Sequence, residues 1–183
     1  MPHLAAPLRV MTAAALAGGV VVAMAAATAN ADPTTTPTSS TPTASPADLN
    51  TLAATLSKGY GLNNCTPQNI INGELASLAC GQSPDPSGPV QAKYILFTNG
   101  GNLATVFKNS IKDDVLTACG DQGQSPTSWH QGSSTTSAGS VACGTYQNGA
   151  EIIWTNDAKN ILSYIRASNT DVGSLFQWWR ANG

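Results

Sequence analysis

Hydrophobic and polar positions follow two different patterns along the chain, and the change falls near residue 48. From there on, apolar residues recur at three- and four-residue spacing in three segments, which predicts helices capped by Asp48, by Asn102 and by Asn169 or Thr170. Runs rich in β-branched and aromatic residues predict strands over residues 75–80, 90–97, 140–146, 151–155 and 160–167. Short turns separate the last three runs, which indicates a meander of hairpins.

This order of elements predicts one α+β domain over residues 48–183. We expect an antiparallel sheet of four or five strands with helices packed on one face, because connections this short join antiparallel strands. The polar stretch 120–140, which contains Trp129, is expected to be a loop. A domain of this length can bury one sizeable hydrophobic core.

Residues 1–31 have the pattern of a secretory signal peptide. A single Arg9 precedes about twenty uncharged residues rich in Ala and Val, and the run ends at the small-residue site Ala29-Asn30-Ala31. We therefore predict cleavage after Ala31 and no stable membrane anchor afterwards. The alternative is an uncleaved anchor helix, since about twenty residues can span a bilayer. The weak hydrophobicity of the run and the distance to the next basic residue, Lys58, favour cleavage.

Residues 32–47 contain only Asp, Pro, Thr, Ser and Ala, and a proline recurs every four or five positions. Such a segment has too little apolar surface to fold on itself and is predicted to be an extended linker. A plain spacer is the simplest interpretation, and O-linked glycosylation of its Ser and Thr residues is the alternative.

The charge content of the chain excludes some function classes. The 183 residues include only 10% charged residues and carry a formal net charge of −2. A protein that binds nucleic acid through a basic patch needs more cations than this, so we expect no nucleic-acid partner. The apolar content of 42% fits a folded domain and not a highly charged disordered chain.

The four cysteines, Cys65, Cys80, Cys119 and Cys143, are expected to form two disulfides, because their number is even and the chain has an export signal. Four cysteines allow three connectivities. We favour Cys65–Cys80 and Cys119–Cys143, which close local loops of about 15 and 24 residues. No Cys-x-x-Cys spacing is present, and one histidine in the predicted mature chain cannot complete a Cys/His zinc site.

Residues suited to catalysis are sparse. His130 is the only histidine after the predicted leader, and a pairing with Ser125 or Ser133 has no supporting motif. Two carboxylates could hydrolyse glycosides. The candidates are Glu74, Asp85, Asp113, Asp114, Glu151, Asp157 and Asp171.

Each of these acidic residues also has a simple structural interpretation. Asp113 and Asp114 are expected to be solvated at a helix end, Glu151 lies in a hairpin, and Asp171 opens a helix, where a carboxylate interacts favourably with the helix dipole. We therefore predict no catalytic residues, and we predict no metal site and no cofactor, because nucleotide-binding and metal-binding motifs are missing from the sequence.

The aromatic residues of the later half are the remaining candidates for a binding site. Adjacent helical residues point about 100° apart, so Trp178 and Trp179 cannot share one helix face. If Trp179 packs in the core, Trp178 either covers a sheet edge or lines a ligand cleft. A mostly apolar pocket with a few polar groups would be typical of a small-molecule site. The candidate ligand-binding residues are Trp178, Trp154, Tyr146 and Arg180.

Taken in order, several segments resemble small exported mycobacterial proteins that are similar to the extracytoplasmic C-terminal modules of actinobacterial serine/threonine protein kinases. The resemblance covers about residues 48–183. Its segments are Cys65, Leu78–Gln82, Gly88–Phe97, Cys119, Ser125–Trp129, Gly139–Tyr146, Ile152–Asp157 and Leu175–Trp179. The resemblance implies a sensor-like α+β domain with two disulfides. The sequence has no kinase glycine-rich loop, no V-A-I-K lysine, no H-R-D and no D-F-G, so it predicts no kinase activity.

These observations predict a secreted, non-enzymatic module that binds an unknown cell-envelope ligand or protein. The first alternative is a secreted hydrolase acting on cell-envelope glycans or esters. The second is a structural protein that its Ser/Thr/Pro-rich linker holds in the cell wall.

Overall fold

The computed structural model describes residues 42–183. The predicted signal peptide and residues 32–41 of the predicted linker lie outside the described residues. The first half contains α1 (Pro46–Ala53), β1 (Cys65–Pro67), β2 (Glu74–Cys80), β3 (Gln91–Phe97), α2 (Gly100–Ser110) and β4 (Val115–Thr117). The second half contains η1 (Gly120–Gln122), β5 (Thr127–His130), β6 (Ser137–Tyr146), β7 (Gly149–Asn156), η2 (Asp157–Lys159), β8 (Ile161–Arg166) and α3 (Val172–Asn182).

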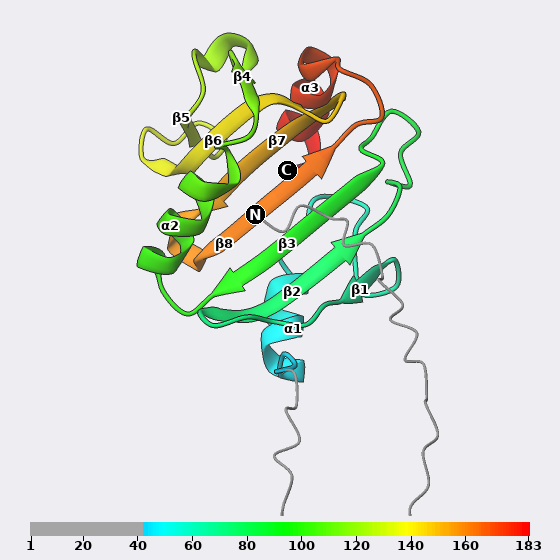
Figure 1. Ribbon diagram of the computed structural model, residues 1–183, viewed down its shortest axis with the longest axis vertical. Coiled ribbons are helices and arrows are strands. Elements are labelled where there is room, and N and C mark those ends of the chain that lie inside the picture. Colours follow the sequence, from blue (N-terminus) through cyan, green and yellow to red (C-terminus); the bar gives the residue numbers. More distant parts are fainter. Residues whose placement is uncertain (1–41) are drawn as a thin grey trace, which may run out of the picture. The chain divides into compact units, whose positions relative to one another are not determined.

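Within residues 42–183, eight strands form one antiparallel sheet with the order β1-β2-β3-β8-β7-β6-β4 (Figure 1). Strand β5 also pairs with β6, on the edge that β4 occupies farther along. The α+β class, the antiparallel sheet and the β6-β7-β8 meander are confirmed. The sheet is wider than the four or five strands expected, because it also contains β1, β4 and β5, which the sequence did not predict. These strands have only three or four residues each. Strands this short contain too few residues to show an alternating pattern.

All three helices described here begin beside the predicted cap and not at it. Ser45 caps α1, and its hydroxyl accepts from the backbone N–H of Asp48 (3.1 Å). Asn99 caps α2 and accepts from the backbone N–H of Asn102 (3.0 Å). In each of these two helices the predicted cap is in fact the N3 residue, whose N–H the true cap binds. Asp171 caps α3, in place of the predicted Asn169 or Thr170.

The β6-β7 hairpin turns at Gln147 and Asn148, which both have positive φ angles (45° and 62°). Two left-handed residues are the mark of the two-residue turn whose twist matches antiparallel strands. Gly149 follows as the first residue of β7. A Cβ at Gly149 would stand 2.6 Å from Nε of Arg166, so this glycine lets the arginine side chain pass.

Helices cover both faces of the sheet, which corrects the expectation that they share one face (Figure 1). Helices α1 and α3 pack on the face that we call the disulfide face, because all four cysteines belong to its core. Helix α2 packs alone on the other face, which we call the α2 face, through Leu103 and Phe107. The meander strand β7 is buried on both sides as a result.

Candidate functional site

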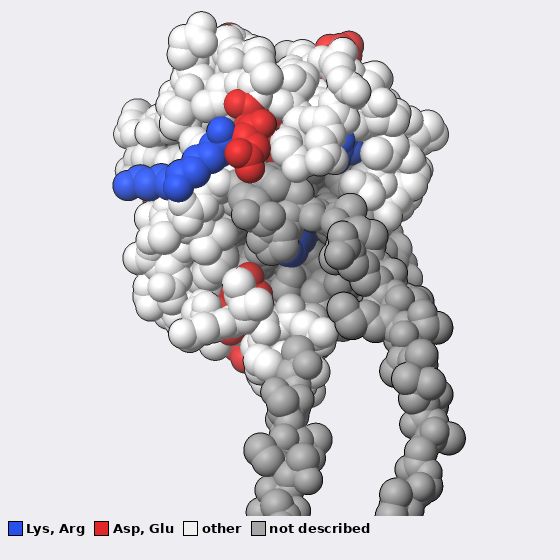
Figure 2. Space-filling model, in the orientation of Figure 1, with Lys and Arg blue, Asp and Glu red and all other residues white. Residues whose placement is uncertain are grey.

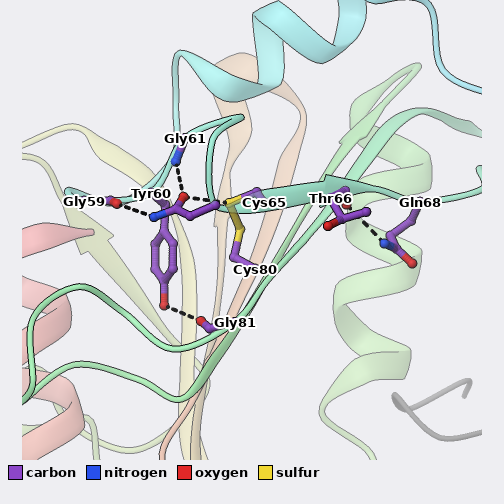
Figure 3. The surroundings of a disulfide bond; sticks show 9 residues. Gly59, Tyr60, Gly61, Cys65, Thr66, Gln68, Cys80 and Gly81 are labelled. Carbon is purple, nitrogen blue, oxygen red and sulfur yellow. Dashed lines mark hydrogen bonds between the residues drawn. A yellow bond between two sulfur atoms is a disulfide. The ribbon is translucent and has the colours of Figure 1, made fainter.

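The first disulfide joins Cys65 to Cys80, as the sequence predicts. The two cysteines are direct partners across the β1-β2 pair. Figure 3 shows Tyr60 reaching past this disulfide, where its hydroxyl donates to the carbonyl of Gly81 (3.2 Å). The disulfide fastens β1 to the end of β2, and the hydrogen bond of Tyr60 fastens the segment before β1 to the residue that follows β2.

The second predicted disulfide, Cys119–Cys143, is also confirmed. It connects the segment before η1 to the middle of β6. Ser125 reinforces this connection, because its hydroxyl accepts from the N–H of Cys143 (2.8 Å) and donates to the carbonyl of Cys143 (3.1 Å). The hydroxyl of Ser125 therefore serves the structure in both hydrogen-bonding roles, which weakens its candidacy as a nucleophile beside His130.

The two predicted tryptophans of the ligand surface lie in the core of the disulfide face. Trp154 is 5% exposed and lies edge-on between Tyr94 and Trp179, with ring centroids 6.3 Å and 5.8 Å away. Trp178 is 6% exposed and contacts Tyr60, and its Nε1 donates to the carboxylate of Asp85 (3.0 Å). Trp178 lines neither of the two grooves described below, so its contacts favour cover for the protein interior over a ligand-lining role.

The other two candidates lie apart from these tryptophans. Tyr146 ends β6 on the α2 face, and the guanidinium of Arg166 lies 5.5 Å from the centre of its ring. Arg180 is exposed near the end of α3, and its Nη1 binds both carboxylate oxygens of Asp121 at 3.0 Å. The structure therefore does not bring the four candidates together into one surface.

A polar groove of about 440 Å³ lies beside Arg180, between the end of α3 and strand β5 with the loop that follows it. Its apolar lining is Trp129 and Trp179, whose rings meet edge-on at 5.7 Å. Trp129 is held by a hydrogen bond from its Nε1 to the carbonyl of Thr155 (2.8 Å). Sequence reasoning missed Trp129 as a lining residue because it placed 120–140 in a loop, whereas strand β5 fixes this side chain.

The groove combines aromatic surface with many hydrogen-bonding groups. The indole N–H of Trp179 is buried and has no hydrogen-bond partner among the described residues. Polar side chains of Arg180, His130, Ser133 and Ser134 also line the groove. The indole N–H itself packs against Gly183, where a Cβ would stand 2.6 Å from its nitrogen, so the hydrogen-bonding groups open to a ligand are these polar side chains. This arrangement suits a polar organic ligand with an apolar face, and a carboxylate would suit Arg180.

A second groove, of about 510 Å³, lies on the α2 face between helix α2 and strands β5 and β6. Helix α2 contributes Leu103, Phe107 and Lys108 to its wall, and Ile111 follows directly after the helix. The opposite wall includes Pro126 just before β5. This groove is more apolar than the first and lacks an aromatic pair.

Two acidic residues of the sequence analysis lie together on the α2 face. Glu151 is 6% exposed in the middle of β7, and Asp114 is half-buried just before β4. One carboxylate oxygen of each, Oε1 of Glu151 and Oδ1 of Asp114, is buried with no hydrogen-bond partner in the described part of the chain. The expectation that Asp114 is solvated is therefore wrong, because the segment between α2 and β4 folds back over the sheet.

The pKa values of this pair lie well above those of free carboxyl groups. Burial is the largest cause and raises the pKa of Glu151 to about 7, the charge of Asp114 acts in the same direction, and the guanidinium of Arg166 opposes both. The pKa of Asp114 rises to about 6, mainly through burial and next through the charge of Asp113. Burial is the main cause of both shifts, and a neighbouring negative charge adds to each of them.

Charged side chains are otherwise few on the face that Figure 2 shows. Basic and acidic groups lie next to each other over the C-terminal end of α2, and most of the visible described surface is uncharged. Within residues 42–183, no group of three or more His, Cys, Asp or Glu side chains is placed to hold a metal ion. None of the helices in this part of the chain is long and apolar enough to cross a membrane.

No family model, curated protein or solved structure matches the chain. The residues and their geometry are therefore the basis for the functional proposal.

Proposed function

We propose that this protein is a secreted, non-enzymatic binding module of the sensor-domain type, which holds a polar cell-envelope ligand in the groove beside Arg180. The observation that carries the proposal is the groove itself, which two tryptophans line together with Arg180 and several polar side chains. The sequence of residues 48–183 resembles kinase extracytoplasmic modules and has no kinase motif, which supports a role in ligand recognition.

Export through a cleaved signal peptide is part of the proposal. The leader pattern of residues 1–31 supports it, and two disulfides suit an oxidising compartment outside the cytoplasm. The scarcity of charge suits a domain that gains stability from crosslinks and aromatic packing.

The ligand class follows from the chemistry of the lining. Tryptophan rings bury the apolar face of an amphipathic molecule, and hydroxyl, amide and imidazole groups satisfy its polar edge. Arg180 already binds a carboxylate, that of Asp121, at an exposed position. Since an exposed ion pair is weak, a ligand carboxylate can compete for this guanidinium. A glycan or glycopeptide fragment that carries a carboxylate meets all of these requirements.

The alternative, a hydrolase of envelope glycans or esters, would depend on Glu151 and Asp114 as its acid pair. Neither residue lines either groove. A glycosidase needs its two carboxyl groups open to the substrate on both sides of the scissile bond. The buried placement of the pair makes a binding module the better-supported function.

The proposal can be tested with isotope-labelled secreted protein and a mixture of soluble muropeptides, which carry carboxylates. We expect the indole N–H signals of Trp129 and Trp179 to shift on addition of the muropeptides. Arg180→Gln should weaken binding by about tenfold, as loss of one charge-assisted hydrogen bond does. Lys108→Gln, in the wall of the other groove, is the matched control and should bind as the wild type does. No shift at either indole with muropeptides would overturn the proposal.

A further inference from the structure

Glu151 is a buried acidic residue that does not line the polar groove. Direct pairing places it beside Gly144 of β6 on one side and Arg166 of β8 on the other. Its Oε1 has no hydrogen-bond partner within residues 42–183, although the side chain is only 6% exposed. An ionised carboxylate in such a position is unfavourable unless it is paired and hydrogen-bonded.

The close approach of strand β4 to Gly144 of β6 brings Asp114 toward this acid. Strand β4 pairs with β6 so that Leu116 lies opposite Gly144 and Val115 opposite Thr145. A Cβ at Gly144 would stand 2.7 Å from the carbonyl oxygen of Val115, so only glycine lets β4 lie this close. Asp114, one residue before β4, therefore lies near enough to Glu151 for their charges to repel.

The other ionisable groups of the α2 face do not neutralise both acids. Arg166 offers the one opposing charge on the strand beside Glu151, and its Nη2 already donates to the carbonyls of Tyr146 (2.8 Å) and Gln147 (2.9 Å). Asp113 is exposed and adds further negative charge beside Asp114. Lys108 and Lys112 are exposed at the same end of α2, but Arg166 is the cation that lowers the pKa of Asp114.

The remaining polar groups on this face are already engaged or more distant. The hydroxyl of Tyr164 is hydrogen-bonded to that of Ser110 at the end of α2. Lys93 lies half-buried on the same face, in the row of Tyr164 and therefore one row away from Glu151.

We propose that Glu151 and Asp114 form a proton-operated latch that holds the connection between α2 and β4, residues 111–114, against the sheet when the pair carries a proton and loosens it when both are ionised. A proton on either acid removes one of the two like charges, and a neutral carboxyl group tolerates burial far better than an ionised one. Loss of that proton leaves two buried negative charges facing one arginine. The connection is the part that moves, because β7 is fixed between two neighbouring strands whereas β4 pairs only with β6.

The latch has a consequence for the apolar groove on the α2 face. Lys108, near the end of α2, and Ile111, the first residue of the connection that carries Asp114, both belong to the groove wall. Proton uptake by the pair would therefore hold this wall in place, and proton release would free it. The pKa values of the pair, about 7 and about 6, place the change between mildly acidic and neutral pH.

Hydrogen exchange followed by NMR tests the latch on the secreted protein. Between pH 5.5 and pH 7.5, protection factors of the amides in residues 111–117 should fall by at least about tenfold in the wild type, since one unit of pKa shift corresponds to a tenfold change in an equilibrium. Amides of the central pair β3 and β8 should change much less. Glu151→Gln, which is neutral and of the same shape, should make the fall in protection of residues 111–117 clearly smaller than in the wild type, and the remaining fall belongs to Asp114.

Asp48→Asn is the control, because it removes one acidic charge in α1 while leaving the pair intact. It should behave as the wild type does. Titration of the side-chain ¹³C carboxyl signals of the wild type provides a measurement that does not depend on any variant. A Glu151 titration midpoint near 4.5, equal protection of residues 111–117 at both pH values in the wild type, or an undiminished pH effect in Glu151→Gln would each overturn the latch.

Discussion

The disulfide face buries both disulfides and a group of aromatic rings, whereas the α2 face buries mainly aliphatic side chains beside an acid pair. On the first face, the covalent bonds and the ring contacts of Trp179 with Trp129, Trp154 and Phe176 do not depend on protonation. On the second, the buried carboxylates of Glu151 and Asp114 can gain or lose a proton. The difference teaches that the two faces of one sheet are stabilised by different chemistry.

Removing the centre of the aromatic group should have the largest effect. Trp179→Ala leaves a cavity among three rings and should lower the free energy of unfolding by about 3 to 5 kcal/mol. Urea denaturation followed by far-UV circular dichroism measures this change. Trp179→Phe keeps most of the ring packing and is the control, so it should lose clearly less. An equal loss in both variants would contradict ring packing as the source of the stability.

Removing one disulfide should come next. Replacing Cys119 and Cys143 together by Ala should cost about 2 to 4 kcal/mol, because the unfolded chain regains the freedom of a 24-residue loop. Denaturation at pH 5 and at pH 8 should give the same loss, since no ionisable group of the α2 face is involved. A loss that changes strongly with pH would show that the two faces are coupled.

The acid pair should produce a smaller effect that depends on pH. Because the folded-state pKa of Glu151 is raised, the folded protein holds its proton more tightly than the unfolded chain does. The free energy of unfolding should therefore be highest at acidic pH and fall as the pH rises from about 4.5 through about 7, by about 2 kcal/mol. Glu151→Gln should flatten this decline, as urea midpoints across the pH range will show. A decline of the same size in the variant would assign it to other groups.

The exposed ion pair should matter least to stability. Asp121→Asn removes the partner of Arg180 on the surface, where solvent screens the attraction. We expect the denaturation midpoint to stay where it is in the wild type at both pH values. The same variant should bind muropeptides at least as well as the wild type, because it frees the guanidinium for the ligand. A weaker affinity would contradict the role given to Arg180.

Local patterns predicted the parts of the fold that depend on local chemistry. Alternation and turn residues located the β6-β7-β8 meander, and the short cysteine spacings indicated both disulfides. The caps of α1 and α2 were misplaced because Asp48 and Asn102 are themselves residues that cap helices well. Their backbone N–H groups instead bind the true caps, Ser45 and Asn99.

The candidate site was harder to predict, because it depends on contacts between distant segments. Trp129 lines the polar groove only because β5 joins the edge of β6, and its own four residues give no sign of that pairing. The burial of Glu151 had one available signal: it interrupts the apolar run Ala150–Trp154, which is typical of a strand covered on both faces. No sequence signal indicated that Asp114 lies on the same face near Gly144.

The position of the β3-β8 pair also bears on how the chain folds. This pair, in which Leu96 lies opposite Ile161, joins an N-terminal group of strands to the C-terminal meander across a long stretch of sequence. Each disulfide lies wholly on one side of that junction. Contacts distant in sequence form late because closing a long loop costs entropy, whereas short loops close readily. Correct cysteine pairing can therefore be reached within each group of strands before the two groups meet along β3 and β8.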